Sequence, residues 1–538
     1  MKRPARLSVI LIFSIVILST VGFFLSKDAL ADLQSLTRQQ LRKFMSVVQL
    51  IQLYYVEPVD WDKSMEGAIT GMLSKLDPHS VYISAKKMKE VRENFNAKFE
   101  GIGIQFDVIN GYLTVIAPIV GSPSDRLGIR SGDKIIKIDG ESAIGITREE
   151  VVKKLRGPKG TSVTVTIIRE GVEEPLEFTI IRDEIPIYTV TTKFMVDDST
   201  GYIKVNRFAA TTSTEVEEAL ISLESQGMKR LILDLRNNPG GYLHEAVKLA
   251  GKFIPGHALI VYTKGRSGNV EDEYYADQFG RRQVRRYPLV VLIDRGSASA
   301  SEIVSGAIQD YDRGIIVGTT SFGKGLVQKE FPLSDGSAVR LTTAKYYIPS
   351  GRSIQRSYKG KSLQEYYQEA GQEEADSLDD ATNKPVFYTK GGRKVYGGGG
   401  IHPDIIEKES YWTYRMAKTT QKIYQKRLFF TYAADYVAKH PELHQQSLRQ
   451  FHKTFQISDT MLKDFKKYVQ QQDVAVDEAD FTRDREFIAL TLKAEIARDI
   501  WNNDGYYFVI MQGDKQFLKA YHSFDLARQL AHAYLQTK

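Results

Sequence analysis

A run of small residues that could present a serine for nucleophilic attack follows the apolar stretch Leu289–Asp294. The run is Gly296-Ser-Ala-Ser-Ala-Ser301-Glu302. Small residues at a strand-to-helix junction let the backbone turn tightly, and the N–H groups at the start of a helix favour developing negative charge. Taken alone, the run is better explained by an N-cap serine at an ordinary helix start.

A lysine between two glycines could supply a base for such a serine. It lies in Ser321-Phe-Gly-Lys324-Gly-Leu-Val-Gln328, after the apolar stretch Ile315–Gly318. Partial burial would lower the pKa of Lys324, and a neutral amine can accept the proton of a serine hydroxyl. By itself, the segment is more typical of a surface lysine in a glycine turn.

Two glycine-containing segments could bind parts of a substrate. Asp234-Leu-Arg-Asn-Asn-Pro239-Gly240-Gly241 ends another apolar run, where glycine N–H groups can approach a carbonyl oxygen. One such donor is typically worth about 3–4 kcal/mol in a transition state. Gly101-Ile102-Gly103-Ile104 could grip a terminal carboxylate while the peptide adds as a strand. The alternatives are a plain turn and a strand with a glycine entry.

The elements that must position these residues fall into four parts after the N-terminal segment. Residues 32–96 are expected to be helical, with a second helix over Asp60–Leu76 that Asp77-Pro78 ends. Residues 97–184 alternate as strands, with one helix starting at a capping-box pattern, Thr147-Arg-Glu-Glu150. Residues 185–410 have short continuous apolar runs between helix-like segments, typical of a buried α/β sheet. Residues 411–538 are expected to be mainly helical.

The N-terminal segment 1–31 predicts the compartment. Lys2, Arg3 and Arg6 precede an uncharged run over 7–25, and Ala29-Leu30-Ala31 offers a cleavage site. This pattern indicates either a cleaved signal peptide or an uncleaved membrane anchor. Both place the rest of the chain outside the cytoplasm, in the periplasm or on the membrane facing it.

The composition excludes several classes of site. The chain has 538 residues, of which 42% are hydrophobic and 26% charged, as in ordinary multidomain globular proteins. It contains no cysteine, so disulfides, thiol nucleophiles, cysteine-ligated zinc and iron–sulfur clusters are excluded. The net charge of +7 comes from no dense basic block, and nucleic-acid binding is not indicated.

Together these segments resemble the tail-specific, or C-terminal processing, serine peptidases. The resemblance runs from about residue 40 to 405 and includes Asp77-Pro-His79-Ser80 and Gly398-Gly-Gly-Ile401-His-Pro-Asp404. It implies a crotonase-like α/β protease core with an inserted PDZ domain over 97–184. The ordered co-occurrence of the motifs is specific, although each one alone is weak.

The resemblance also assigns roles to residues. The family's catalytic lysine follows its nucleophile by 25 positions, which selects Ser299 over Ser297 and Ser301 as the partner of Lys324. Gln328 would orient Lys324. The oxyanion hole would pair the N–H of Ala300 with that of Gly240 or Gly241, between which the sequence does not decide. His79, His244, Glu302 and Arg236 are expected to be structural.

The implied activity is endoproteolysis through an acyl-enzyme, without metal or cofactor. The PDZ loop Gly101–Ile104 would capture the free, apolar C-terminus of a protein substrate, and the PDZ domain could gate the site. A homo-oligomer and an adaptor protein are further expected partners. The alternatives are a catalytically inactive PDZ scaffold and acyl-CoA chemistry on the same core fold.

Overall fold

The computed structural model describes residues 37–169, 171–280, 283–371 and 384–536. Along these stretches, no helix combines the length and apolar character needed to cross a membrane. The segment 1–31, expected to be a signal peptide or anchor, lies outside them. The chain divides into two units at the junction of Leu76 and Asp77.

The described part of the first unit is helical, as predicted. One helix covers 37–54 and a second, α2, covers Trp61–Leu73. The side chain of Asp60 caps α2 by accepting a hydrogen bond from the backbone N–H of Lys63 at 3.1 Å. Helix α2 ends at Leu73, three residues before the expected end at Leu76, and element boundaries are what sequence patterns locate least precisely.

The segment between Asp77 and the β-rich domain departs from the helical expectation. The side chain of Asp77 accepts hydrogen bonds from the N–H groups of His79 and Ser80 at 2.8 and 2.9 Å, which folds the chain into a turn. Strand β1 (Val81–Ile83) follows and pairs with β18 (Ala338–Tyr347). Helix α3 (Ala85–Asn96) then leads into the inserted domain.

The inserted domain has the predicted strands and helix. Its sheet has the order β3-β4-β5-β7-β8, with β6 (Glu141–Ser142) on β5. The other strands are β3 Ile104–Ile109, β4 Tyr112–Pro118, β5 Lys134–Ile138, β7 Ser162–Ile168 and β8 Leu176–Ile181. Helix α5 (Arg148–Leu155) begins at the predicted capping box of Thr147 and Glu150, and α4 is a single turn, Pro123–Arg126. The chain enters and leaves the domain through an antiparallel pair, β2 (Lys98–Gly101) and β9 (Asp183–Pro186).

The protease-like core is built on a six-stranded sheet with the order β10-β11-β12-β15-β16-β21. The strands are β10 Val190–Met195, β11 Thr200–Val205, β12 Arg230–Asp234, β15 Leu289–Ile293, β16 Ile315–Gly318 and β21 Ile405–Ile406. All neighbours from β11 to β21 run parallel, and β10 is antiparallel. Such strands are buried on both faces, which explains their continuous apolar sequences.

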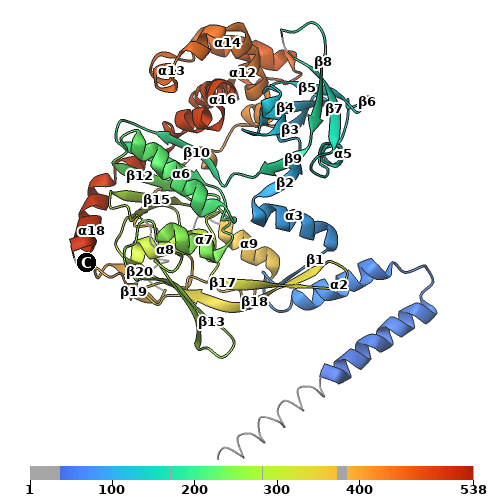
Figure 1. The fold of residues 1–538 in the computed structure, drawn as a ribbon, viewed down its shortest axis with the longest axis vertical. Coiled ribbons are helices and arrows are strands. Elements are labelled where there is room, and N and C mark those ends of the chain that lie inside the picture. Colours follow the sequence, from blue (N-terminus) through green and yellow to red (C-terminus); the bar gives the residue numbers. More distant parts are fainter. Residues whose placement is uncertain (1–36, 170, 281–282, 372–383, 537–538) are drawn as a thin grey trace, which may run out of the picture. The chain divides into compact units, whose positions relative to one another are not determined.

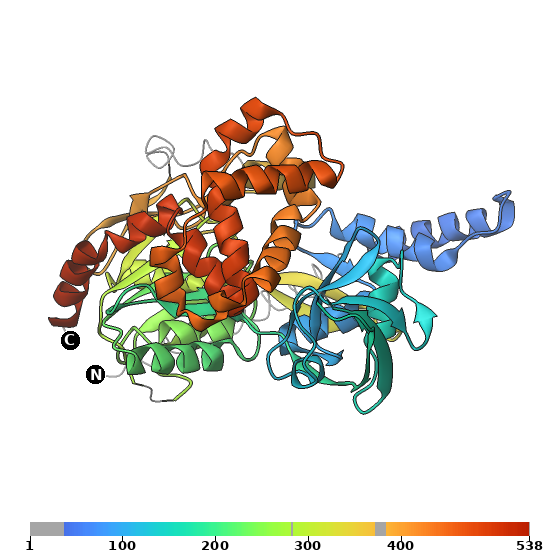
Figure 2. The same cartoon turned by 90° about the horizontal axis from the view of Figure 1, so that it is seen from above.

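Helices cover both faces of this sheet, and Figure 2 shows the layers edge-on, with the helices of residues 200–250 in green and the C-terminal helices in orange and red. Leu231 and Leu233 pack on the side of α6 (Thr212–Ser225), α7 (Leu243–Ala250) and α8 (Ala300–Asp310). Ile232, between them, packs on the opposite side among residues of the C-terminal extension. Because side chains alternate between the two faces of a strand, one apolar run contributes to a core on each face of the sheet.

A second sheet lies beside the core and carries part of the site. It pairs β1, β18, β13 and β14 in that order, with β17 also on β18. The remaining strands are β13 Leu259–Lys264, β14 Val270–Tyr275 and β17 Leu326–Pro332, and a small sheet pairs β19 (Val386–Tyr388) with β20 (Lys394–Tyr396). Helix α9 (Leu363–Gly371) follows β18 (Figure 1).

The C-terminal extension is helical, as expected, and is part of the core rather than an appendage. Its α-helices are α11 Lys418–Gln425, α12 Leu428–Lys439, α13 Leu448–Thr454, α14 Asp459–Gln471, α15 Glu478–Arg483, α16 Arg485–Met511, α17 Lys515–Tyr521 and α18 Phe524–Gln536. Arg427, which precedes α12, also forms an ion pair with Asp107 of the inserted domain at 3.1 Å. The extension therefore contacts both the sheet and the inserted domain.

A buried ion pair ties this extension to the loop after β12. Arg236, 1% exposed, bonds to Asp234 at 2.7 Å and to Asp514, at the start of α17, at 2.8 Å. We expect Asp514→Ala to lower the free energy of unfolding by about 3 kcal/mol, because it leaves the Arg236 charge buried with one partner fewer. Denaturant unfolding measures the loss.

Asp525→Ala is the matched control on α18. Asp525 is 87% exposed and forms an ion pair with Arg528, one turn away. Its removal should change stability by less than about 0.5 kcal/mol. Equal stability of the two variants would show that the Arg236 network does not hold the extension to the core.

Candidate active site

Ser299 lies at the junction of strand β15 and helix α8 in a backbone conformation that few residues adopt. Its φ of 56° and ψ of −111° lie outside the regions that side-chain-bearing residues prefer. Strain of this kind is typical of functional turns. Ser299 is the N-cap of α8, lines a cavity of about 600 Å³ and is partly exposed there.

The neighbouring serines are buried and bonded to other loops. The hydroxyl of Ser297 donates to the carbonyl oxygen of Leu235 at 2.8 Å, and that of Ser301 donates to the carbonyl oxygen of Asn238 at 3.0 Å. Both side chains are 0% exposed. Of the three serines in the run, Ser299 is therefore the one that faces the cavity.

The carboxylate of Glu302 holds the serine turn and the lysine loop together. One of its oxygens accepts hydrogen bonds from the backbone N–H of Ser299 at 2.7 Å and of Lys324 at 2.9 Å. The other accepts from the hydroxyl of Ser321 at 2.5 Å and the N–H of Gly323 at 2.7 Å. Burial raises the pKa of Glu302, and these four donors oppose that shift by stabilising the charged form. Glu302 is thus structural, as predicted.

The lysine loop is packed too closely for larger residues. Gly323 has a φ of +87°, and a Cβ there would come within 3.1 Å of the nitrogen of Gly400. Gly400 in turn lies against Ser321, whose carbonyl oxygen would be 2.4 Å from a Cβ on Gly400. The backbone of Ile401 adds two hydrogen bonds to Ser321, at 2.6 and 3.0 Å. The Gly398–Asp404 segment therefore supports the loop that carries Lys324.

Lys324 reaches the cavity with its amine held by Gln328. The Nζ of Lys324 donates to Oε1 of Gln328 at 2.8 Å, and the amide nitrogen of Gln328 donates to the carbonyl oxygen of His79 at 2.5 Å. Burial lowers the pKa of Lys324, and the nearby Arg340 lowers it further. Within the described structure, no hydrogen bond joins Nζ of Lys324 to the hydroxyl of Ser299.

Among the residues that the structure describes, neither histidine near the site has a hydrogen bond to the side chain of Ser299 or Lys324. His79 is 6% exposed, and its ring nitrogen bonds to the hydroxyl of Tyr366 at 3.2 Å. Burial lowers the pKa of His79 to about 4, so this imidazole is neutral at physiological pH. His244 lines the cavity, with its ring 4.9 Å from that of Tyr242. No group of acidic and histidine side chains suited to a metal ion occurs in the described stretches.

Of the two candidate glycines, Gly241 has the available N–H. The N–H of Gly240 donates to the side chain of Asn238 at 2.9 Å. Phe208 bonds to the carbonyl of Gly240 and to the N–H of Tyr242, both at 2.9 Å, on either side of Gly241. Gly241 and Phe208 thus pair as residues of two parallel strands do, and in such a pair the N–H of Gly241 points away from Phe208.

The Gly240–Gly241 loop also packs directly on the start of α8. A Cβ on Gly240 would lie 2.8 Å from the nitrogen of Ala300, whose N–H, in the first turn of the helix, has no intrahelical acceptor. Both glycines line the same cavity as Ser299. The loop and the helix end thus present two N–H groups beside Ser299.

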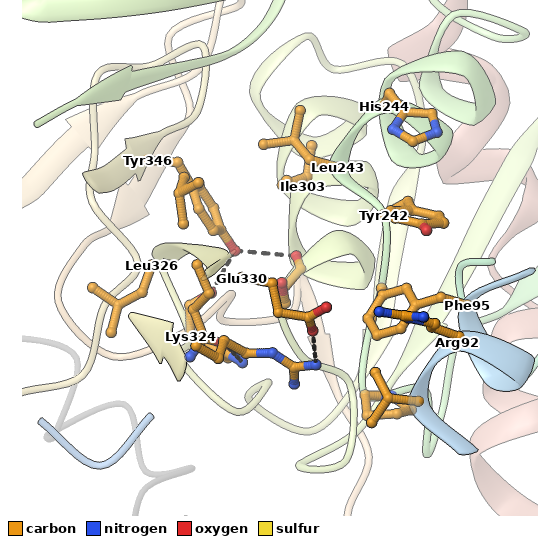
Figure 3. A pocket seen from close by; sticks show the side chains of 18 of the residues that line it. Arg92, Phe95, Tyr242, Leu243, His244, Ile303, Lys324, Leu326, Glu330 and Tyr346 are labelled. Carbon is orange, nitrogen blue, oxygen red and sulfur yellow. Dashed lines mark hydrogen bonds and ion pairs between the residues drawn. The ribbon is translucent and has the colours of Figure 1, made fainter. Parts of the chain in front are cut away.

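Several cavity residues come from elements that the sequence motifs did not include. Helix α3 contributes Arg92 and Phe95, and β18 contributes Arg340 and Tyr346. Figure 3 shows Phe95 beside Tyr242 and, across the cavity, Tyr346. The hydroxyl of Tyr346 lies 3.1 Å from the carbonyl oxygen of Ser299 and 2.5 Å from that of Lys324, and its single proton can be donated to either. The serine and lysine motifs do not identify these residues, because α3 and β18 are distant from both motifs in the sequence.

Helix α3 also contacts the inserted domain. Arg156, which follows α5, forms an ion pair with Glu93 of α3 at 2.5 Å. Two residues further along α3, the ring of Phe95 lies 4.9 Å from that of Tyr242. One helix therefore carries contacts with both the inserted domain and the cavity.

The predicted tail-binding loop has free N–H groups at the edge of the inserted sheet. The carbonyls of Ile102 and Gly103 accept hydrogen bonds from the hydroxyls of Ser124 and Ser122 at 2.8 and 2.9 Å. The N–H groups of Ile102 and Gly103 make no backbone hydrogen bond in the described structure. β3, which begins at Ile104, is an edge strand with one side open. This arrangement suits a peptide that adds as a strand.

Comparison with known proteins gives matches over most of the chain. Residues 199–360 match the model of peptidase family S41, and residues 114–169 match a PDZ domain. Residues 25–87 match the N-terminal domain of the activating protease CtpB, and residues 419–502 match a family of unknown function, DUF8443.

A carboxy-terminal-processing protease of Bartonella bacilliformis is 41% identical over 351 residues, which cover 63% of this chain and 80% of that protein. This chain belongs to peptidase family S41. The carboxy-terminal processing protease CtpB of Bacillus subtilis is 37% identical to it, over 61% of this chain and 68% of CtpB. A solved structure of a photosystem II D1 C-terminal processing protease is 27% identical and covers 67% of this chain and 86% of that one, with a TM-score of 0.35.

The family assignment confirms the expected peptidase and the PDZ domain. The chain is a C-terminal processing peptidase of family S41 with a PDZ domain inserted before its protease core. The motifs outside the PDZ domain contribute residues to the cavity or hold residues that line it.

The contact between Gly240 and α8 predicts that the S41 site tolerates no side chain there. We expect Gly240→Ala to lower kcat roughly 100-fold or more, because the added methyl lies 2.6–2.8 Å from Ala298, Ala300 and Ser299 and must displace the serine turn. Cleavage of an unfolded reporter protein measures the loss.

Gly256→Ala provides a matched control. Gly256 also has a positive φ, +72°, but has open space around its Cβ position. It should lose about 1 kcal/mol of stability from backbone strain and keep its activity. If both variants stayed active, the close packing of the glycine loop on α8 would not matter for catalysis.

Proposed function

We propose that this S41 peptidase is a serine endopeptidase that uses Ser299 and Lys324 as a catalytic dyad and selects substrates by their C-terminal tails. The observation that carries the proposal is that one carboxylate, Glu302, holds the backbones of both residues at the same cavity. Burial of Lys324 and the strained turn at Ser299 support their roles as base and nucleophile.

In the first step, the neutral amine of Lys324 accepts the proton of the Ser299 hydroxyl while its oxygen attacks the substrate carbonyl carbon. In this proposal the lysine side chain turns from Gln328 toward the serine when substrate binds, since catalytic hydrogen bonds often close only in the substrate complex. The resulting ammonium of Lys324 then gives its proton to the leaving amine. An acyl-enzyme on Ser299 remains.

In the second step, Lys324 takes a proton from a water molecule that attacks the acyl carbon, and the ammonium then returns a proton to the oxygen of Ser299 as the ester bond breaks. In both steps, negative charge develops on the carbonyl oxygen. The N–H of Ala300 and the N–H of Gly241 are the donors that we assign to it, because Gly240 already donates to Asn238. The start of α8 adds its dipole at the same point.

The PDZ domain supplies the proposed tail selection. The free N–H groups of Ile102 and Gly103 support capture of a terminal carboxylate, and the open edge of β3 supports pairing with the preceding residues. The apolar segment over 7–25 further supports action outside the cytoplasm, on exported proteins.

Serine and lysine variants test the dyad. In the full chain, Ser299→Ala and Lys324→Ala should each reduce cleavage of an unfolded reporter at least about 1,000-fold. A fluorophosphonate probe should label Ser299 in the parent, and peptide mapping should find no label on Ser297 or Ser301. Cleavage that survived either variant would overturn the assignment. A parent with tail binding but no cleavage would favour the scaffold alternative.

The same assay gives a pH prediction. The dyad needs the unprotonated amine, so kcat/KM should rise with pH as Lys324 loses its proton. Burial lowers the pKa of Lys324, which places this rise below the value expected for an exposed lysine. Lys324→Arg keeps the charge but cannot deprotonate, and it should be inactive at every pH. A pH-independent kcat/KM from pH 6 to 10 would contradict Lys324 as the base.

Tail recognition has its own test. Binding of a fluorescent apolar peptide with a free C-terminus should weaken at least about tenfold when the C-terminus is amidated, because the carboxylate charge is lost. Gly103→Ala should have the same effect, since its Cβ would come 2.2 Å from the Cβ of Ser122. Gly111→Ala, at a turn with the same positive φ and no neighbour within 4 Å, is the control. Equal binding of the acid and the amide would exclude carboxylate capture.

A further inference from the structure

Arg340 places a second positive charge in the cavity that contains Lys324. It lies on β18, directly opposite Glu330 of β17, and the two side chains form an ion pair at 2.7 Å. Both residues line the cavity with Ser299 and Lys324. The dashed line at Glu330 in Figure 3 marks this ion pair. A hairpin of two paired strands therefore fixes the guanidinium at the cavity.

A second contact holds Arg340 from the opposite wall. Its guanidinium lies 5.8 Å from the ring centre of Phe95 on α3, within the range of a cation–π interaction. The ring of Phe95 packs in turn on Tyr242. Arg340 is only 24% exposed, so solvent screens its charge less than that of a surface arginine.

The charges around Lys324 come from several elements and oppose one another. Arg340 disfavours the ammonium form, whereas Glu302 of α8 and Asp77 of the turn before β1 favour it. His79 is neutral at physiological pH. The other charged side chains that line the cavity are Arg92 of α3 and Glu330 of β17. Arg340 is thus the positive group whose charge opposes those of Glu302 and Asp77 at the lysine.

We propose that Arg340 is a positioning residue for catalysis, whose guanidinium, held by Glu330 and Phe95, keeps the amine of Lys324 in its neutral, proton-accepting form. The inference rests on the proposed function of Lys324 as base. Arg340 acts through Lys324 and has no bond to make or break in the reaction. Its ion pair with Glu330 occupies the guanidinium, which argues against a main role in gripping a substrate carboxylate.

The pH profile of the full chain tests this role. With Arg340→Gln, kcat/KM should fall roughly tenfold at pH 7. At pH 9.5 it should lie within about twofold of the parent value, because raising the pH restores the neutral amine. Arg340→Lys keeps the positive charge and should keep the parent profile. Lys329→Gln removes an exposed charge from the same hairpin and should change nothing. A loss that is equal at all pH values, or confined to KM, would overturn the proposal.

A second measurement follows the protonation of the Lys324 amine and needs no substrate turnover. Competitive acetylation with acetic anhydride, followed by peptide mass spectrometry, reports the pH at which the Lys324 amine becomes reactive. In a Ser299→Ala background, Arg340→Gln should move this pH upward and Lys329→Gln should not. An unmoved pH would refute the electrostatic role of Arg340. If cleavage instead persisted in Ser299→Ala or Lys324→Ala, the dyad would fail while this readout still decided the effect of Arg340 on Lys324.

Discussion

The geometry of the site depends on one buried carboxylate. Glu302 accepts four hydrogen bonds. Two come from the residues that we assign as nucleophile and base, and two come from the loop that carries the lysine. A carboxylate has enough acceptor sites for all four donors, whereas an amide or hydroxyl does not. The cost of burying its charge is offset by these bonds and by its place at the start of α8. The same contacts can hold the serine turn in its strained conformation.

The layers of the core bring the bonded segments together. Parallel strands end at one edge of the sheet, so the turn after β15 and the loops after β12 and β16 converge there. The second sheet closes the site from the side through Gln328, Arg340 and Tyr346. The C-terminal extension covers the far face of the main sheet and reaches the loop after β12 through Arg236 and Asp514. The positions of the site residues therefore depend on a sheet whose two faces are both buried.

Much of this arrangement could be predicted from local sequence. Period-two alternation gave the PDZ strands, and the capping box placed α5 within one residue. The choice of Ser299 over Ser297 and Ser301 needed the family resemblance, because small-residue turns look alike in sequence. The choice of Gly241 over Gly240 needed the structure, since it depends on the contacts of Asn238 and Phe208. β1 was missed because three residues carry no periodicity, and Phe95, Arg340 and Tyr346 were missed because only tertiary contacts bring them to the cavity.

The β2–β9 pair through which the PDZ domain is inserted has a mechanical consequence. The chain enters and leaves the domain on adjacent strands that form a narrow two-stranded stalk, and ion pairs of Arg156 with Glu93 and of Asp107 with Arg427 join the domain to α3 and to the extension. Only Ala97 separates the last residue of α3 from that stalk. Phe95, three residues before β2, therefore lies close to the point where the PDZ domain joins α3, and it also lines the cavity. A rotation of the domain about the stalk would therefore act on Phe95 and on the ion pair of Glu93 with Arg156 at the same time.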